Sequence, residues 1–328
     1  MIFFCAINIA VQTLVSLDNF ERMLNQPSEN ELLGMMHLLG SDDNEHLVMV
    51  GDSTVWGVSA DFDESFAGLL STRLGEDSAE VVNLAVPGMS FLDEYAVIEN
   101  LWNPHDTYIV FINPIWFHDR YNDKTPEDYI RFPQLVSRYL SESAGALEEC
   151  CNFSLLAGKP PLQRAITDVV MRYVPLFRNR DLVNKQMLGM QPSIAENTIL
   201  HRIAAMNFAG AIQREELAPD EGDTEEKETA LALDIEKSRS FGLLKHVLSL
   251  SEKRDNVHYV ILDDNWYERT ALHKESMNKL EQLFEGRHVL NVHNAFEQKH
   301  YFGNGYTHLN SAGHILMTDL LYDFLYAN

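Results

Sequence analysis

The sequence predicts a three-layer α/β fold, in which helices cover both faces of a central parallel sheet of about five strands. Two observations carry this prediction. Short apolar runs alternate with segments of helical periodicity over residues 46–117, and the same alternation resumes after residue 230. Between them, residues 125–230 form an insertion that is mostly helical in pattern. We therefore expect a single α/β domain over residues 46–328, interrupted by this insertion and preceded by an apolar and helical segment at residues 1–45.

The elements before the insertion follow one another along the chain. A helical pattern covers roughly residues 18–39 and leads to an apolar strand at 46–50, which ends in a glycine turn. Alternating elements are then expected in this order: a helix at 66–75, a strand at 79–88, a helix at 91–102 and a strand at 107–117. Strands that alternate with helices indicate crossover connections and a parallel sheet.

The elements after the insertion repeat the pattern. The insertion closes with an acidic stretch at residues 218–228, which is typical of a solvated loop. The remaining elements are expected in this order: a helix at 234–254, a strand at 256–264, a helix at 274–286, a strand at 288–296 and a final helix at 311–327. These segments would complete the sheet.

The composition excludes several classes of function. With 25 Lys and Arg against 49 Asp and Glu, the net charge is −24, which argues against nucleic acids and anionic membrane surfaces as partners. The three cysteines are too few for a disulfide framework. No CxxC or HExxH motif indicates a metal site, and neither a GxGxxG nor a P-loop motif indicates a nucleotide. We therefore expect no metal and no cofactor.

The first 17 residues, MIFFCAINIAVQTLVSL, leave three interpretations open. They are apolar, but they lack a basic start and are short for a full membrane span. They form an N-terminal membrane anchor, an uncleaved signal-like segment or a helix buried in protein. The anchor would favour a place in the cell envelope, outside the cytoplasm, whereas a buried helix would favour the cytoplasm.

Polar and glycine residues follow several of the predicted strands. Gly-Asp-Ser ends the first strand at Ser53, Pro-Gly ends the second at Gly88, and Asn113 follows the third. His308 lies in the loop between the last strand and the last helix. Because ligands bind beyond the carboxyl ends of parallel strands, we expect these four residues to share one edge of the sheet.

Three of these segments resemble the motifs of the SGNH/GDSL hydrolases. They are GDSTVWG at 51–57, VVNLAVPG at 81–88 and HLNSAG at 308–313. The resemblance covers residues 46–117 and 256–326, and it implies a flavodoxin-like fold with serine esterase or acyltransferase activity. It also implies that Ser53 is the nucleophile and His308 its base. The backbone amides of Ser53 and Gly88, with the Asn113 side chain, would form the oxyanion hole.

Physical chemistry makes these roles plausible. A serine hydroxyl is a weak nucleophile near neutral pH unless a base takes its proton, and imidazole can both accept and return that proton. The alternative interpretations are structural: Ser53 as a helix N-cap, Asn113 as part of an Asn-Pro turn, and Asn310 as a helix start. Asp52 is expected to be a turn residue rather than the acid of a triad.

Two features depart from the family pattern. The segment FINPIWFHD lacks the usual G-x-N-D, and the position three residues before His308 is Gly305 instead of an aspartate. Asn304, Asp263 or Asp264 could orient the histidine in its place. A site with impaired activity is a further alternative.

The sequence thus predicts a serine hydrolase of the esterase or deacetylase type, acting on a small-molecule or carbohydrate ester. One alternative is an acyl (acetyl) transferase that modifies envelope carbohydrate with the same nucleophile and base. The other is a binding protein on the same fold without activity. The helical insertion is expected to influence specificity.

Overall fold

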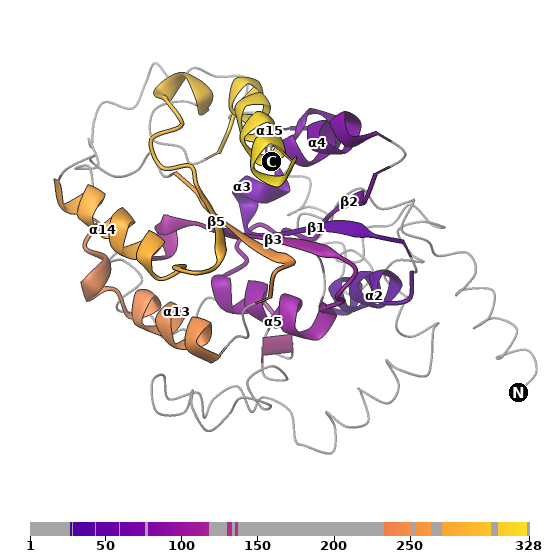
Figure 1. The fold of residues 1–328 in the computed structure, drawn as a ribbon, viewed down its shortest axis with the longest axis horizontal. Helices are drawn as coiled ribbons and strands as arrows, with labels where there is room; N and C mark the ends of the chain where they lie inside the picture. Colours follow the sequence, from indigo (N-terminus) through magenta and orange to yellow (C-terminus); the bar gives the residue numbers. More distant parts are fainter. Residues whose placement is uncertain are drawn as a thin grey trace, which may run out of the picture.

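The computed structural model describes residue 27 and residues 29–42, 44–58, 60–75, 78–117, 130–132, 135–136, 233–250, 254–263, 271–302 and 308–326. In this part of the chain a single sheet of five parallel strands runs in the order β2-β1-β3-β4-β5 (Figure 1). This order is the flavodoxin-like one, and it confirms the predicted fold class. The helical insertion and residues 1–17 fall almost wholly outside the described residues.

The five strands lie within the segments predicted for them. They are β1 (His46–Val50), β2 (Glu80–Asn83), β3 (Thr107–Ile112), β4 (Val257–Ile261) and β5 (His288–Asn291). All but the first are shorter than expected. β3 ends at Ile112 because Pro114, which has no amide hydrogen to pair with a neighbouring strand, begins the 3₁₀ turn η3 (Pro114–Phe117).

Helices cover both faces of the sheet, as Figure 1 shows. On one face lie α2 (Glu29–Leu39), α5 (Phe91–Leu101), α13 (Arg239–Leu250) and α14 (Ala271–Gln282). On the other lie α4 (Phe66–Leu74) and α15 (Ser311–Tyr326). α2, which we placed in the segment before the domain, packs on α5 and shares its core.

The two layers of helices explain the unbroken apolar run of β1. Val48 and Val50 belong to the core beneath α5, whereas Leu47 and Met49 belong to the core beneath α4 and α15. Since successive side chains of a strand point to opposite faces, a strand covered on both sides is apolar throughout. The same run leads directly into Gly51, Asp52 and Ser53 at its carboxyl end.

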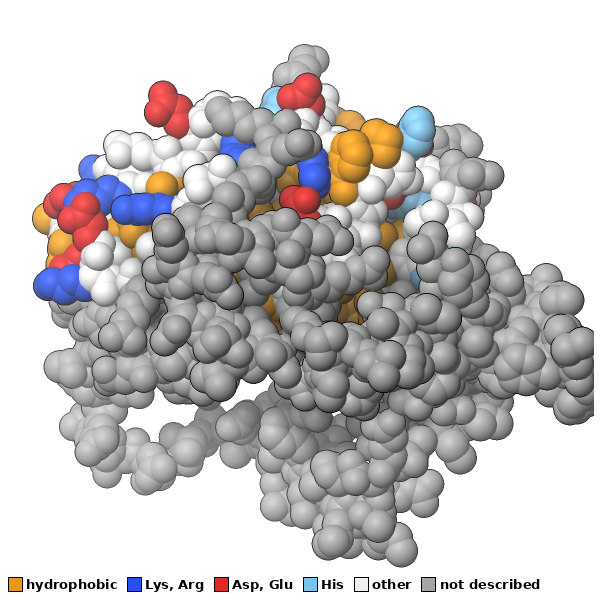
Figure 2. Space-filling model, turned by 90° about the horizontal axis from the view of Figure 1, so that it is seen from below, with side chains coloured by type: hydrophobic (Ala, Val, Ile, Leu, Met, Phe, Trp, Pro, Cys, Tyr) orange, Lys and Arg blue, Asp and Glu red, His pale blue; other side chains and the backbone are white. Residues whose placement is uncertain are grey.

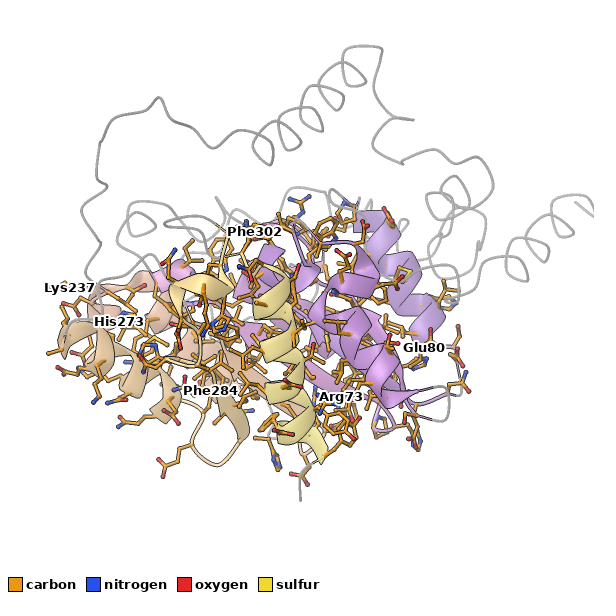
Figure 3. The ribbon with its side chains drawn as sticks, turned by 90° about the horizontal axis from the view of Figure 1, so that it is seen from above. Arg73, Glu80, Lys237, His273, Phe284 and Phe302 are labelled. Atoms are coloured by element: carbon orange, nitrogen blue, oxygen red, sulfur yellow. The ribbon has the colours of Figure 1, made fainter. Side chains whose placement is uncertain are left out.

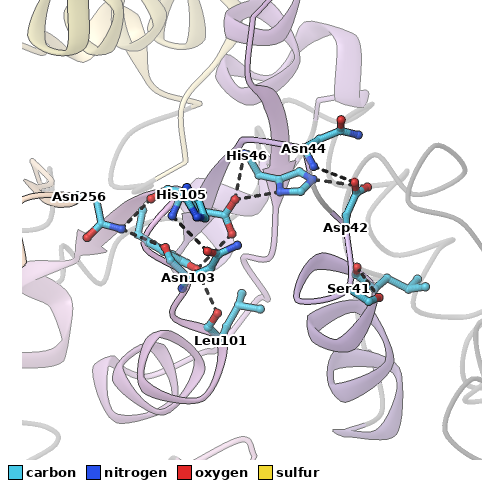
Figure 4. Close-up of polar contacts among 11 residues, drawn as sticks. Ser41, Asp42, Asn44, His46, Leu101, Asn103, His105 and Asn256 are labelled. Carbon is cyan, nitrogen blue, oxygen red and sulfur yellow. Dashed lines mark hydrogen bonds and ion pairs between the residues drawn. The ribbon is translucent and has the colours of Figure 1, made fainter.

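A buried polar cluster closes the opposite, amino-terminal edge of the sheet (Figure 4). The His46 backbone N–H and ring Nδ1 lie 3.1 and 3.0 Å from Asp106 Oδ1. Asn256 donates from Nδ2 to the carbonyl oxygen of Asp106 at 2.7 Å. This cluster joins the starts of β1, β3 and β4, so His46 has a structural place at the edge away from Ser53.

The described surface carries charges of both signs. At one end of the face in Figure 2, acidic and basic side chains lie together. Among the ion pairs of the described residues, Lys279 pairs with Glu275 and Glu236, and Lys237 pairs with Asp234. None of the helices described is both long and apolar enough to span a bilayer. Nor do the described residues include three or more His, Cys, Asp or Glu side chains arranged to hold a metal ion.

Candidate active site

Ser53 and His308 meet at the carboxyl edge of the sheet. The two residues are 255 positions apart in the sequence, yet Ser53 Oγ lies 3.0 Å from His308 Nε2. Ser53 is the first residue of α3 (Ser53–Trp56), directly after β1, and both side chains are half-buried. The structure therefore brings together the hydroxyl and the imidazole that the sequence singled out, at hydrogen-bonding distance.

The GDSTVWG segment folds tightly around the serine. Asp52 is the N-cap of α3: its Oδ1 accepts a hydrogen bond from Thr54 N at 2.9 Å, so the Ser53 hydroxyl remains available to His308. A Cβ on Gly51 would lie 2.4 Å from Val55 Cγ2, closer than packed atoms approach. Gly57 ends α3 in the left-handed conformation, with φ 81°. The local geometry thus explains why glycine stands at positions 51 and 57. The N-cap of α3 is Asp52 instead of Ser53.

A short antiparallel contact holds His308 in place. Tyr301 and Leu309 form an isolated bridge, and the Phe302 N–H donates to the His308 carbonyl oxygen at 3.1 Å. The Asn310 N–H donates to the carbonyl oxygen of His300 at 3.0 Å. We call residues 300–302 and 308–310 together the histidine clasp.

The clasp is fastened to the start of α15. Asn310 Oδ1 accepts from Gly313 N at 3.1 Å, which is the N-cap interaction expected of it, and Asn310 Nδ2 donates to the carbonyl oxygens of Lys299 and Tyr301. A Cβ on Gly313 would lie 2.3 Å from the His300 carbonyl oxygen. Only glycine allows the helix to approach the clasp this closely. His314, one turn into the helix, is buried and accepts from Phe66 N.

Two backbone amides follow the neighbouring strands β1 and β2. Beyond the end of β2, Leu84 N and Val86 N donate to the carbonyl oxygens of Met49 and Gly51, at 2.8 and 3.0 Å. Ser53 and Gly88 lie two residues beyond the second of these bonds. Gly88 has φ 78°, a conformation that favours glycine. Within the described part of the chain, the amides of Ser53 and Gly88 form no hydrogen bond, so both can serve as donors to a ligand.

Asn113 lies at the same edge, and both the nitrogen and the oxygen of its side-chain amide form hydrogen bonds. Its Nδ2 donates to Asp52 Oδ2 at 2.7 Å, and its Oδ1 accepts from Ile115 N at 3.1 Å. The Asn-Pro turn of the structural interpretation is therefore formed. The amide group is directed at Asp52, and one of its two hydrogens is used there.

The charges of Asp52 and His308 act on each other. Burial raises the pKa of Asp52, and its hydrogen bonds from Thr54 and Asn113 oppose this rise, as does the charge of His308. Burial lowers the pKa of His308, and the negative charge of Asp52 opposes this fall. The lowered pKa of His308 favours the neutral imidazole, the state in which it can accept a proton.

The residues predicted to orient His308 are placed only in part. Asp263 is buried just beyond β4, with its Oδ1 3.4 Å from His293 Nδ1. Asp264 and Asn304 lie outside the described residues, as does Gly305. Among the described residues, the carboxylate whose charge reaches His308 is that of Asp52, for which the sequence predicts a turn role. Asp52 therefore has two roles: it caps α3 in the turn after β1, and its charge acts on His308.

Sequence reasoning missed two buried carboxyl groups at the start of α5. Asp93 forms a capping box with Ser90 and also accepts from Phe132 N at 2.9 Å. Burial and the charges of Asp52 and Asp93 raise the pKa of Glu94 well above its ordinary value. Glu94 Oε2 is buried and has no hydrogen-bond partner among the described residues. In the sequence these acids look like ordinary first-turn residues of a helix, which carry no signal of burial.

Comparison of the chain with models of known protein families and with curated proteins finds no match. The geometry of the site and the three short motifs are therefore what points to a function.

Proposed function

We propose that the protein is a serine hydrolase of the SGNH type that cleaves a small or carbohydrate-like ester through an acyl-enzyme on Ser53. The observation that carries the proposal is the 3.0 Å contact between Ser53 Oγ and His308 Nε2 at the carboxyl edge of a parallel sheet. Nucleophile and base within hydrogen-bonding reach are the signature of an activated serine.

The reaction would proceed in two balanced halves. Ser53 Oγ attacks the ester carbonyl while His308 Nε2 takes the hydroxyl proton, and the oxyanion is held by the amides of Ser53 and Gly88. The intermediate then collapses: the ester C–O bond breaks, and His308 returns the proton to the departing alcohol. Water or a sugar hydroxyl next attacks the acyl-enzyme while His308 takes its proton; the bond between the acyl carbon and Ser53 Oγ then breaks, and His308 returns the proton to Ser53. Water gives an esterase, and a sugar hydroxyl gives an acyltransferase.

Asp52 would assist His308 electrostatically. When the imidazole gains a proton, its positive charge is stabilised by the nearby buried carboxylate, an attraction that already acts against the fall of the His308 pKa. Asp52 is anchored for this role by hydrogen bonds at 2.9 Å from Thr54 N and 2.7 Å from Asn113 Nδ2. Asn113, so engaged, would act on the oxyanion through its second amide hydrogen.

Hydrolysis of 4-nitrophenyl acetate tests the proposal. We expect Ser53→Ala and His308→Ala each to lower kcat by about 10³-fold or more, because the two groups act as a unit. The matched controls are Ser78→Ala and His105→Ala, which change an exposed serine and an exposed histidine away from the site. They should retain wild-type rates. Ester cleavage that persists in Ser53→Ala would refute the proposal. A wild-type protein that neither cleaves esters nor reacts with a fluorophosphonate would also refute it.

A further inference from the structure

Arg131 lies beside the candidate oxyanion hole. Its guanidinium Nη1 is 3.7 Å from the point that a Cβ on Gly88 would occupy. The side chain is half-buried, and it enters from the start of the insertion rather than from an element of the sheet. A positive charge therefore stands next to one of the two amides that would hold the oxyanion.

Hydrogen bonds to Asp93 hold the backbone of Arg131 in place, and this determines where its side chain begins. The Arg131 N–H donates to both carboxylate oxygens of Asp93, at 3.2 and 3.1 Å. Asp93 also accepts from Phe132 N, Ser90 N and Ser90 Oγ. The carboxylate of Asp93 thus binds backbone and hydroxyl donors, and it holds the main chain of Arg131 instead of the guanidinium.

Among the described residues, the guanidinium itself has no hydrogen-bond or ion-pair partner. Its Nε is buried without a hydrogen bond, and no ion pair joins it to any residue in the described part of the chain. Burial lowers the pKa of Arg131, and the charge of Asp93 only partly opposes this. Leaving a partly buried cation unpaired is costly, and a chain with 49 acidic residues offers many carboxylates that could have neutralised it.

We propose that Arg131 binds an anionic oxygen group of the substrate, a carboxylate or phosphate a few atoms from the scissile carbonyl. This inference rests on the proposed function, and it narrows the substrate to a negatively charged ester. The planar guanidinium can donate two parallel hydrogen bonds to such a group. In an acidic protein, a local cation is what allows an anionic ester to approach the site.

Paired esters that differ only in charge test the inference. The anionic members are the mono-4-nitrophenyl ester of succinate, 4-acetoxybenzoate and 4-acetoxyphenyl phosphate, which place a carboxylate on the acyl side, a carboxylate on the alcohol side and a phosphate on the alcohol side. Each is compared with its methyl-capped counterpart. For at least one pair we expect the wild type to prefer the anion in kcat/KM. Arg131→Met should lower that preference by about 10- to 100-fold, the value of a charged hydrogen bond.

Two further variants separate loss of charge from loss of structure. Arg131→Lys keeps the charge but not the paired donors, and it should retain part of the preference. Arg73→Met is the matched control, because Arg73 pairs with Asp319 in the middle of α15 and lies away from Phe302, which belongs to the histidine clasp (Figure 3). It should retain the full preference. No preference in the wild type for any anionic ester, or a preference unchanged in Arg131→Met, would overturn the inference.

A binding measurement distinguishes this failure from failure of the proposed function. Ser53→Ala protein, which should not turn over, is titrated by calorimetry with each anionic ester and with its methyl-capped counterpart. We expect tighter binding of the anion by about tenfold or more, and loss of the difference in Ser53→Ala/Arg131→Met. Charge-dependent binding without any reaction of wild-type Ser53 would refute the hydrolase but support the anion site. Reaction of Ser53 without charge-dependent binding would refute the anion site alone.

Discussion

Gly313→Ala should damage both stability and activity through one clash. The added Cβ would lie 2.3 Å from the His300 carbonyl oxygen and 3.0 Å from Leu309 Cβ. Ordinary contacts need about 3.4 Å, so α15 and the histidine clasp would have to separate by about 1 Å. His308 belongs to that clasp and lies 3.0 Å from Ser53 Oγ. A shift of this size takes the pair beyond hydrogen-bonding distance.

The expected magnitudes follow from that displacement. Overpacking of this kind costs about 1–3 kcal/mol in the free energy of unfolding, against a gain of about 1 kcal/mol from replacing a helical glycine by alanine. A misplacement of about 1 Å in a catalytic pair costs roughly 10²-fold in rate. Gly242→Ala is the matched control, because Gly242 is an exposed glycine inside α13 with nothing within 4 Å of the added Cβ. It should gain stability by about 1 kcal/mol.

Urea denaturation followed by circular dichroism measures the stability of both variants, and the rate of labelling by a fluorophosphonate measures the reactivity of Ser53. Gly313→Ala should be less stable than Gly242→Ala and should label roughly 10²-fold more slowly than the wild type. If Gly313→Ala were as stable and as reactive as Gly242→Ala, the close packing of α15 against the histidine clasp would be refuted, and with it our account of how His308 is held.

Three further predictions concern charge. Glu94→Gln should raise the free energy of unfolding at pH 8, because a raised carboxyl pKa gives stability that is full below about pH 4.5 and is lost as pH rises through the folded pKa. The slope against pH should change by up to about 1.4 kcal/mol per pH unit. Asp52→Asn should slow fluorophosphonate labelling about tenfold and move its acid limb to lower pH, since the charge that raises the pKa of His308 is gone. The wild-type limb itself should lie below pH 6.5. His46→Gln should lower the free energy of unfolding by about 1–3 kcal/mol, because it removes the ring bond to buried Asp106, and should leave labelling unchanged.

Each of these has a result that would contradict it. An unchanged pH slope in Glu94→Gln would mean that Glu94 is ionised in the native protein. An acid limb that stays in place, or moves to higher pH, in Asp52→Asn would exclude an electrostatic role of Asp52 towards His308. Slower labelling in His46→Gln without loss of stability would place His46 in the site, contrary to its position at the opposite edge of the sheet.

The sheet could be predicted because its physics is local. Each buried strand appears as an apolar run, and each crossover helix as a change to helical spacing, so five strands were found within a few residues of their ends. The meeting of Ser53 and His308 followed from topology, since both segments lead to the carboxyl edge. The apolar runs predicted the ends of four strands too far along the chain, and at β3 the cause is a single residue: Pro114 begins a 3₁₀ turn, so the strand ends at Ile112 instead of residue 117.

The surroundings of the pair could not be predicted, because burial and contact across the chain leave no local pattern. The sequence predicts a turn role for Asp52, and Asp52 has that role, but its charge also acts on a histidine 256 residues away. Glu94 resembles any acid in the first turn of a helix. In the sequence, Arg131 is one of many basic residues in a helical insertion. Only its position beside Gly88 in the structure points to a binding role.

The most direct test of the central claim is to identify the residue that a fluorophosphonate modifies. Intact protein and its proteolytic peptides, analysed by mass spectrometry after treatment near pH 8, should show one phosphonyl group, on Ser53, and none in protein carrying His308→Ala. A label on a different serine, or equal labelling of Ser53 with and without the imidazole, would contradict a nucleophile activated by His308.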